Sequence, residues 1–423
     1  MVHTHRCSGV FSALVFLTAA HASVAATYYV TPTGKSSNNG SAAAPWRQIR
    51  DALPRLVPGD TVLVADGSYE GFTMEEISGT AGQPITIQAT GENVVINKTT
   101  DRSDNRDTIK ITFCTYVVID GLTAFNANRA AVRVDQSDHV TVRNGEFGNN
   151  TTWGIFTNNS NDLLIELNHC YGSVQEHGIY VSNTCVNPTV RMNVSHDNRG
   201  CGLHFNGDRS QGGIGIITGA LVEKNIIFNN GAGGGAAINM DGVRSSTVRN
   251  NLIYNNHATG IALFKANAAQ GPSGVDIYHN TIDMPSDGRW ALGISRSDAL
   301  AGKINVRNNI LNHRNAARGG ISYRSSTDVA NTDSDYNILS KMTPNDGRTV
   351  YTLVQWKAKG HELHSLSAGI ASLFVNATGG DYHLLSNSLA LRVGQPVGVV
   401  DDLEGKPRPS QGPIDIGCYQ LSQ

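Results

Sequence analysis

The sequence predicts an all-β protein built as a parallel β-helix, a single coil of short strands stacked turn upon turn. The first observation is a recurring asparagine, which stands three positions after the start of a short apolar-alternating stretch. Successive asparagines are 25, 32, 26, 29, 29 and 28 residues apart, a spacing typical of a solenoid with variable loops. Stacked asparagines hydrogen-bond along their column. They are Asn168, Asn193, Asn225, Asn251, Asn280, Asn309 and Asn337.

The second observation is a column of aliphatic residues that we expect to point into the core, one in each turn, or rung, of the coil. Several of its members follow a glycine, as a tight turn into a strand requires. Polar or glycine-rich insertions at residues 208–219, 266–274 and 285–288 separate some rungs. The column comprises Val132, Ile155, Ile179, Leu203, Ile238, Ile261, Ile294 and Ile321.

The third observation is composition. The 423 residues include 33 Lys and Arg against 35 Asp and Glu, and only 16% are charged. This balance excludes a basic nucleic-acid binder and a disordered chain. Because solenoids grow along one axis, the length is compatible with one elongated domain, which we expect to be a monomer.

The chain divides into four segments. Residues 1–26 carry an apolar run, Val10 to Ala20, that is too short to span a bilayer, and they end in small residues. They predict a secretory signal peptide cleaved after Ala26, and hence a secreted or periplasmic protein. No later stretch is long and apolar enough for a membrane helix.

Residues 27–107 predict an N-terminal cap and the first rungs. Trp46, Ile49 and Leu53 recur at helical spacing there, and a short capping helix would shield the open end of the coil. Residues 108–342 form the central rungs. Residues 343–423 predict an irregular, partly helical region with closing strands at residues 382–385 and 415–419.

Cysteine usage predicts thiols rather than a disulfide framework. Removal of the signal peptide and Cys7 leaves five cysteines, an odd number without CxxC spacing. We expect buried free thiols, with one bridge among Cys170, Cys185 and Cys201 as the alternative.

Strand alternation selects the residues that face solvent. If the aliphatic column points inward, Phe156, Tyr180, His204 and Asn239 stand side by side on the outer face. Asn158, Ser182, Asn206 and Asp241 form a second outward column. Neighbouring rungs lie about 4.8 Å apart, so these side chains are within reach of one ligand.

This constellation suits the cleavage of a uronic-acid polymer, which requires a neutralised carboxylate, a base for the C5 proton and an acid for the leaving oxygen. His204 has an ordinary pKa of about 6.5, suited to a base. Tyr180 is the acid, or the two exchange roles, and Lys265 is the rival base. The predicted substrate-binding residues are Phe156, Asn158, Ser182, Asn206, Arg209, Asn239, Asp241 and Arg244.

Other interpretations of these residues stay open. His177 has inward parity and is more typical of a structural histidine. Asp241 binds calcium, orients His204 or caps a turn, and turn capping is the commonest role for such a residue. Asp208 and Asp241 are the candidate calcium ligands, and they are also the carboxylate pair that a glycoside hydrolase needs. A glycan-binding adhesin without catalysis would use the same cluster as contact surface.

The stacked rungs and the closing residues Asp401 to Pro409 resemble the superfamily of secreted right-handed parallel β-helix proteins. That superfamily includes pectate, alginate and chondroitin lyases, mannuronan epimerases and several glycosidases. The resemblance implies a right-handed coil that acts on a polysaccharide, and it covers most of the mature chain.

Locally the chain is similar to periplasmic mannuronan C5-epimerases, whose rungs carry Tyr-Gly-Ile-Asp-Pro-His-Asp and Lys-His-Gly-Ile-Ile-Ile-Ser-Arg. Residues 153–159 here are Trp-Gly-Ile-Phe-Thr-Asn-Asn, and residues 176–183 are Glu-His-Gly-Ile-Tyr-Val-Ser-Asn. The catalytic histidine of that family falls on Asn158 and its arginine on Asn183, so the epimerase motif is missing. We therefore predict an exported lyase for an acidic polysaccharide, with hydrolase, epimerase and adhesin as alternatives.

Overall fold

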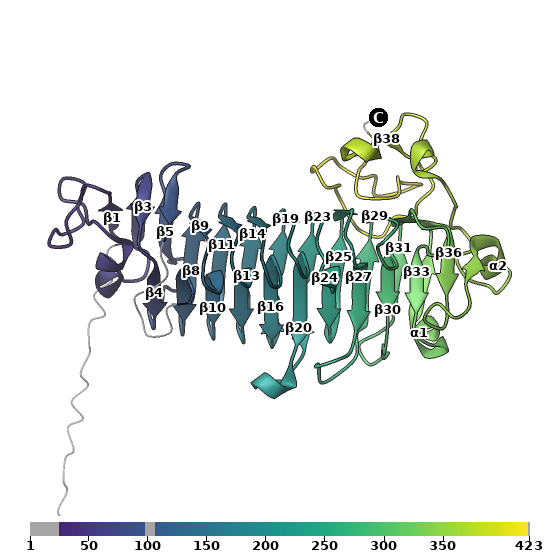
Figure 1. Ribbon diagram of the computed structural model, residues 1–423, viewed down its shortest axis with the longest axis horizontal. Coiled ribbons are helices and arrows are strands. Elements are labelled where there is room, and N and C mark those ends of the chain that lie inside the picture. The colour runs from purple at the N-terminus through teal and green to yellow at the C-terminus, as the bar shows by residue number, and fades with distance from the viewer. Residues whose placement is uncertain (1–24, 98–105, 422–423) are drawn as a thin grey trace, which may run out of the picture.

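The computed structural model describes residues 25–97 and 106–421, and these wind into a parallel β-helix with three sheets along its length (Figure 1). Most rungs contribute one strand to each sheet. Of the predicted signal peptide, only Ala25 and Ala26 are among the described residues, and Cys7 lies outside them. Within the described part of the chain, no helix has the length and apolar character needed to cross a membrane.

Sheet 1 has fourteen strands, all paired in parallel. They are β1 (Thr27–Val30), β2 (Thr61–Val64), β5 (Ile85–Ala89), β8 (Thr115–Asp120), β11 (Asp138–Arg143), β14 (Leu164–Glu166), β17 (Cys185–Val186), β18 (Thr189–Arg191), β21 (Ile217–Thr218), β22 (Leu221–Glu223), β25 (Val243–Arg249), β28 (Ser273–Tyr278), β31 (Ile304–Arg307) and β34 (Thr332–Asp335).

Sheet 2 has twelve strands and precedes sheet 1 in each rung; only its last pair, β36 with β37, is antiparallel. They are β4 (Phe72–Glu75), β7 (Ile109–Thr112), β10 (Ala130–Asp135), β13 (Trp153–Asn158), β16 (Ile179–Asn183), β20 (Leu203–Gly207), β24 (Ala236–Asp241), β27 (Thr259–Phe264), β30 (Leu292–Ile294), β33 (Ile321–Tyr323), β36 (Lys341–Thr343) and β37 (Tyr351–Thr352).

Sheet 3 has eleven strands and completes each rung. They are β3 (Gly67–Tyr69), β6 (Val94–Ile96), β9 (Thr123–Phe125), β12 (Glu146–Gly148), β15 (His169–Tyr171), β19 (Val194–His196), β23 (Ile226–Phe228), β26 (Leu252–Tyr254), β29 (Thr281–Met284), β32 (Ile310–His313) and β35 (Ile338–Leu339).

The predicted aliphatic column fills the core, and its register is confirmed from Val132 to Ile261. The prediction for the next member of the column, Ile294, was wrong. Ile261 pairs with Leu292, which pairs with Ile321, whereas Ile294 pairs with Leu263. Ile294 and Leu292 both point inward because they are two residues apart, so the hydrophobic pattern alone does not distinguish them.

The predicted asparagine ladder lies at the corner between sheets 1 and 3. Each amide donates to the carbonyl oxygen of the next asparagine at 2.9–3.1 Å. That same oxygen also accepts the backbone N–H of the preceding asparagine, as Asn280 does for Asn251. The residue before each asparagine has positive φ, such as Leu167 at 56°. Because this conformation costs an L-residue about 1–2 kcal/mol, the ladder must hold the corner in place.

A second ladder, which the sequence analysis missed, lies at the corner between sheets 3 and 2. Asn198 donates to Asn230 at 2.9 Å, and Asn230 donates to Asn256 at 3.1 Å. Each follows a member of the first ladder by five residues, which is the signal that could have found it. Two of the three corners are therefore fixed by hydrogen bonds, and the long insertions at residues 208–216 and 265–272 occupy the third.

Short helical elements lie at the two ends of the coil. The predicted N-terminal helix is two 3₁₀ turns, η1 (Ile49–Asp51) and η2 (Leu53–Arg55), with Trp46 fully buried beside them. α1 (Ser326–Ala330) and α2 (Leu353–Lys357) lie near the far end, where Trp356 packs against Tyr323.

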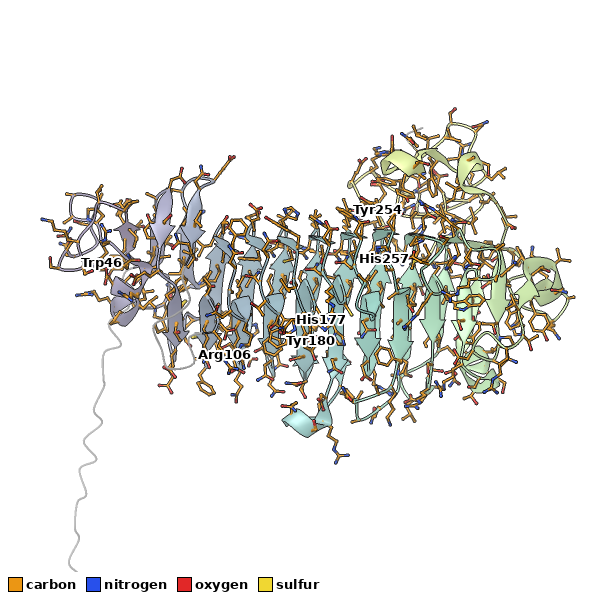
Figure 2. The ribbon with its side chains drawn as sticks, in the orientation of Figure 1. Trp46, Arg106, His177, Tyr180, Tyr254 and His257 are labelled. Carbon is orange, nitrogen blue, oxygen red and sulfur yellow. The ribbon has the colours of Figure 1, made fainter. Side chains whose placement is uncertain are left out.

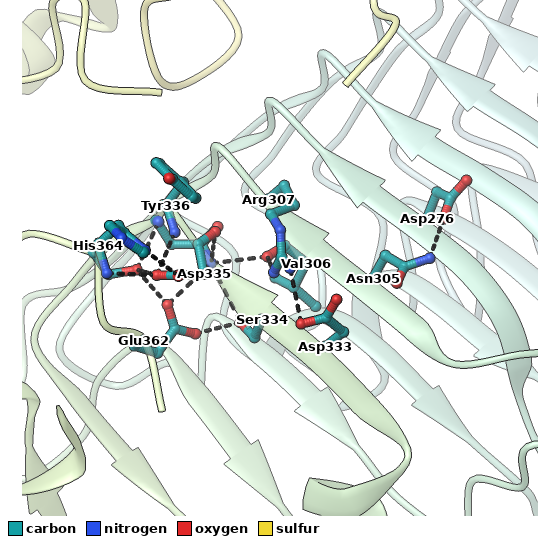
Figure 3. Close-up of polar contacts among 12 residues, drawn as sticks. Asp276, Asn305, Val306, Arg307, Asp333, Ser334, Asp335, Tyr336, Glu362 and His364 are labelled. Atoms are coloured by element: carbon teal, nitrogen blue, oxygen red, sulfur yellow. Dashed lines mark hydrogen bonds and ion pairs between the residues drawn. The ribbon is translucent and has the colours of Figure 1, made fainter. Parts of the chain in front are cut away.

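Buried Glu362 ends the first ladder (Figure 3). It accepts hydrogen bonds from Ser334 and Asn337, while the backbone N–H of Asn337 donates to Ser365. Beside it, His364 contacts Asp335 at 2.7 Å. The last asparagine therefore keeps its partners although no further rung follows it.

The C-terminal region folds back over the outer face of sheet 3 (Figure 1), where Leu252, Ile310 and Ile338 are buried. It contains η4 (Ile370–Ser372), η5 (Ala377–Gly379) and the hairpin of β38 (Phe374–Asn376) and β39 (Asp381–Leu384). Residues 415–419, predicted as a strand, are buried but irregular, because buried Arg408 takes up their backbone carbonyls.

The cysteines follow the prediction of free thiols. Cys114, Cys170, Cys185, Cys201 and Cys418 are all buried and unbridged.

Candidate functional site

The outer face of sheet 2 differs from that of sheet 1 in how its charges are paired. On sheet 1, Arg143 contacts Asp120 at 2.9 Å, and the corresponding pairs in later rungs are Arg191 with Glu166 and Arg249 with Glu223. Their charges are neutralised within the sheet. Along sheet 2, Lys265, Arg289 and Arg324 have no carboxylate partner among the described residues. This face therefore carries the candidate site.

Tyr180, His204 and His177 form a compact cluster in the middle of sheet 2; Figure 2 shows His177 beside Tyr180. The rings of Tyr180 and His204 are stacked, with centroids 4.6 Å apart and planes 7° apart. This stack follows from the register, which pairs the two residues on β16 and β20. His177 meets both rings edge-on, and its Nε2 lies 2.8 Å from Nδ1 of His204.

Burial keeps this cluster uncharged. It lowers the pKa of His177 to about 4 and, together with the neighbouring His177, lowers the pKa of His204 well below its usual range. Burial also raises the pKa of Tyr180 to about 12. At neutral pH both imidazoles are therefore neutral and the phenol is protonated.

Asn206 lies on the same strand as His204 and joins it to Tyr180 on the preceding rung. Its amide nitrogen donates to the Tyr180 hydroxyl at 2.9 Å, which leaves the phenolic proton free to be donated elsewhere. The Asn206 side-chain oxygen is buried and has no partner among the described residues. A buried unpaired acceptor of this kind is costly, so this oxygen is a strained point of the cluster.

A hollow of about 550 Å³ continues this face beyond Asn239. Three arginines line it, Arg289, Arg318 and Arg324, and Asp346 is the one acidic residue of its lining. Arg318 donates to the carbonyl of Gly288. The guanidinium groups of Arg289 and Arg324 have no hydrogen-bond or ion-pair partner in the described ranges, so the hollow offers cationic donors to an anion.

The lining also contains Trp290 and Phe264, and Asn239 joins the hollow to the histidine cluster. Asn239 pairs in register with His204, one rung away. Its side chain has no hydrogen-bond partner within the described part of the chain, so it is available to a ligand. Cluster and hollow thus form one continuous surface.

The predicted residues near β13 are on this face but engaged by neighbours. Phe156 is nearly buried, because Trp153 stacks on it at 4.4 Å and the Arg133 guanidinium lies 4.9 Å from its ring centre. It is therefore not an open platform for a sugar ring. Asn158 hydrogen-bonds to Asp135 and Asn183. Ser182 is buried and donates to the backbone of Thr157 at 2.6 Å.

Two predicted cations lie elsewhere. Arg244 belongs to β25 of sheet 1, where it is buried and contacts Asp298 at 2.8 Å. The structure does not bring it to the sheet 2 face, because the chain has turned the corner at Gly242. Arg209 lies on the exposed turn η3 (Arg209–Gln211), at the corner between sheets 2 and 1.

The third predicted cation, Lys265, follows β27, and its ammonium has no partner among the described residues.

Of the two candidate calcium ligands, Asp241 accepts backbone N–H groups at both carboxylate oxygens and Asp208 at one. Both carboxylate oxygens of Asp241 accept backbone N–H groups, from Ala266 at 2.8 Å and Asn267 at 2.7 Å. Asp208 caps η3 by accepting from Ser210. Turn capping is thus the role that Asp241 performs in the fold, and the same bonds reduce the oxygen ligands available to a cation.

A nitrogen and sulfur site is the other candidate for a metal. His177, Cys201 and His204 each place a ligand atom within 4.8 Å of the others, and such donors suit zinc. The donor set nevertheless does not fit. A metal on Nε2 of His177 would leave the ring proton on Nδ1, which already accepts the N–H of Cys201 at 2.9 Å.

Sequence reasoning missed the hollow. With the corrected register, Arg289 stands three residues before Leu292 and Arg318 three residues before Ile321. Aligning Ile294 in place of Leu292 hid this repeat. His177 was expected to be a satisfied structural histidine with inward parity; both of its ring nitrogens are hydrogen-bonded, but at the corner before β16 its ring meets the outward Tyr180.

Comparison with known proteins agrees with this architecture. Residues 28–178 match a family model described as the Pel9A-like right-handed β-helix region, and the chain is a right-handed parallel β-helix. The pectate lyase Pel9A superimposes with a TM-score of 0.64 at 18% identity, covering 94% of this chain and 96% of that one. XylC in complex with xylose gives 0.57 at 10% identity, covering 94% and 99%.

One curated relative, the uncharacterized protein YwoF of Bacillus subtilis (strain 168), is 37% identical over 70 residues. The match spans 16% of this chain and 15% of that relative. The family match ends at Gly178, before Tyr180, His204 and the arginine hollow.

Proposed function

We propose that this protein is an exported enzyme that cleaves an acidic polysaccharide by β-elimination on the outer face of sheet 2. The observation that carries the proposal is the continuity of one surface. The uncharged Tyr180 and His204 pair adjoins, through Asn239, a hollow lined by Arg289, Arg318 and Arg324. Proton-transfer groups and carboxylate-binding groups thus lie within reach of one bound polymer.

The arginines support the assignment of an acidic substrate. A guanidinium group binds a carboxylate through two parallel N–H bonds, and the hollow holds three such groups against one carboxylate, that of Asp346. Trp290 adds an apolar surface for the face of a sugar ring. A neutral glycan would leave these cations without partners.

The reaction is balanced without a redox partner. A base removes the C5 proton, and the electron pair of that C–H bond forms the C4=C5 double bond. The C4–O4 bond breaks, and the departing oxygen takes a proton from an acid. Tyr180, His204 and Lys265 are the candidate groups for these transfers, and Asn206 and Asn239 bind the sugar. Pel9A, which has the same fold, is named as a pectate lyase; that similarity supports the fold, and the side chains carry the chemistry.

The test is to incubate the purified protein with a panel of uronate polymers, namely polygalacturonate, alginate and chondroitin. A lyase produces an unsaturated, ultraviolet-absorbing product. New reducing ends without this absorbance would indicate a hydrolase, and C5 inversion without shortening an epimerase. Binding with none of these signals would indicate an adhesin, and each of these three outcomes would overturn the proposal.

A further inference from the structure

We propose that His177 is a positioning residue that fixes the tautomer of His204, so that His204 presents an Nε2–H donor to the substrate carboxylate and is not the base. The inference rests on the proposed function for its catalytic consequence, but the tautomer itself is a property of the unliganded protein. It follows from three hydrogen-bonding steps.

The first step is the backbone N–H of Cys201, which lies 2.9 Å from Nδ1 of His177. A backbone amide is always a donor, so Nδ1 of His177 must be the acceptor and carries no proton. Gly200 makes this approach feasible, because a Cβ atom there would come within 2.6 Å of Nδ1. A neutral His177 therefore carries its proton on Nε2.

The second step joins the two rings. Nε2 of His177 lies 2.8 Å from Nδ1 of His204. Because Nε2 is the donor, Nδ1 of His204 is the acceptor, and a neutral His204 must carry its own proton on Nε2. Burial keeps both rings neutral by lowering their pKa values. Glu176 is the acidic group nearest His177, at 3.5 Å from the same Nε2; its side chain is 45% exposed, and the same carboxylate oxygen accepts the indole N–H of Trp153 at 2.8 Å.

The third step is the exposure of the remaining nitrogen. His204 belongs to the outward column of sheet 2, and its Nε2 has no partner among the described residues and is not sealed in the interior. The chain from Cys201 through His177 to His204 thus ends in one N–H without a partner on the outer side of sheet 2. Such a neutral imidazole polarises a carboxylate or carbonyl that gains charge in the transition state.

This assignment changes the roles in the elimination. A neutral ring protonated on its exposed nitrogen does not accept the C5 proton there, so His204 stabilises the charge that develops on the carboxylate. Tyr180, which stays protonated, donates to the leaving oxygen, and the C5 proton is taken by a base other than His204. Substitution of His177, which does not touch the sugar, should therefore reduce kcat more than it changes KM.

The direct test is ¹⁵N NMR of the histidine-labelled wild-type protein, with the His204 signals assigned by their loss in His204→Gln. We expect both rings to carry the proton on Nε2 from about pH 6 to 9. A proton on Nδ1 of His204, or an imidazolium at pH 7, would overturn the proposal. This measurement needs no substrate, so it stands even if no polymer is cleaved.

The second test compares His177→Phe, which keeps the ring volume without its nitrogens, with the more conservative His177→Gln. We expect the Phe variant to lose the single tautomer at His204 and to lose about 10- to 100-fold in kcat, as for other groups that orient a catalytic side chain. His177→Gln should recover part of both. A Phe variant with unchanged tautomer and unchanged kcat would show that His177 positions nothing.

Discussion

The imidazole of His204 lies against the phenol of Tyr180 with the two ring planes 7° from parallel. A second stack of the same kind lies on sheet 1, where Tyr116 and His139 are 4.3 Å apart and 9° from parallel. The first stack adjoins the arginine hollow and the second does not. The molecule therefore provides its own control for the role of the first.

Tyr180→Phe should keep the stack and remove only the hydroxyl. We expect a loss of about 10²- to 10⁴-fold in turnover, the usual contribution of a proton-transfer group, with an unchanged far-ultraviolet circular dichroism spectrum. The readout is the initial rate of unsaturated-product formation. Tyr116→Phe is the matched control and should retain the wild-type rate; equal rates in both variants would exclude Tyr180 from the chemistry.

Arg289→Ala and Arg324→Ala should each raise KM with little effect on kcat. Because partly exposed ion pairs are worth about 0.2–1 kcal/mol, we expect up to about a fivefold increase for each variant. The dependence of KM on sodium chloride should also weaken, since fewer charges bind the polymer. Arg47→Ala is the control, at the N-terminal end and exposed. A KM that does not move in the double variant would remove the hollow from the binding site.

Acid should destabilise the fold through His177. Its folded pKa of about 4 lies below the ordinary value of 6.5, so the unfolded chain binds a proton that the folded protein does not. Above pH 6.5 the ring is neutral in both states and costs no stability. As the pH drops from 6.5 toward 4, the free energy of unfolding falls by on the order of 3 kcal/mol.

The measurement for this prediction is urea denaturation at pH 7.5, 6 and 5. His177→Gln carries no titrating ring and should show a shallower decline than the wild type. Buried histidines remote from the cluster, such as His279, contribute equally to both proteins and cancel in the difference, whereas His204, which contacts His177, adds to the effect of the substitution. Parallel declines would mean that His177 titrates normally in the folded protein.

Asn251→Ala should destabilise the coil without touching the site. The substitution leaves the buried N–H of Asn225 and the carbonyl of Val222 without their partners, at a cost of about 2–3 kcal/mol. Thermal or urea denaturation gives the value. The control is Asn305→Ala, which removes a half-buried amide bonded to Asp276. A similar loss of unfolding free energy in both variants would show that the ladder stabilises the fold no more than an ordinary surface hydrogen bond does.

Much of the architecture could be predicted from the sequence because the coil repeats itself. A ladder asparagine is fully constrained by its corner, and the outward partners of Tyr180 follow from strand alternation once one register is known. The predicted register failed at Leu292, because Ile294, an aliphatic residue of the same parity two positions later, fits the same hydrophobic pattern. That single slip concealed the alignment of Arg289 with Arg318.

The site was harder to predict than the fold because corners do not obey alternation. His177 lies just before β16, where the backbone turns, so its parity gave the wrong direction. The prediction that Arg244 lies on the sheet 2 face failed for a related reason, because the chain turns into sheet 1 at Gly242, two residues earlier. Side chains at corners are placed by turn geometry and by the rungs above and below, neither of which a single strand pattern encodes.

The cover on sheet 3 has a consequence for how the chain is made. Leu252, Ile310 and Ile338 are shielded by a region that follows them in the sequence, which Lys224 and Arg408 fasten to the coil through Asp401 and Asn250. While the chain emerges from the ribosome, these apolar rungs exist before their shield does. The coil therefore cannot complete its folding until the C-terminal region has been synthesised. A chain truncated before residue 366 would expose an apolar surface that is prone to aggregation.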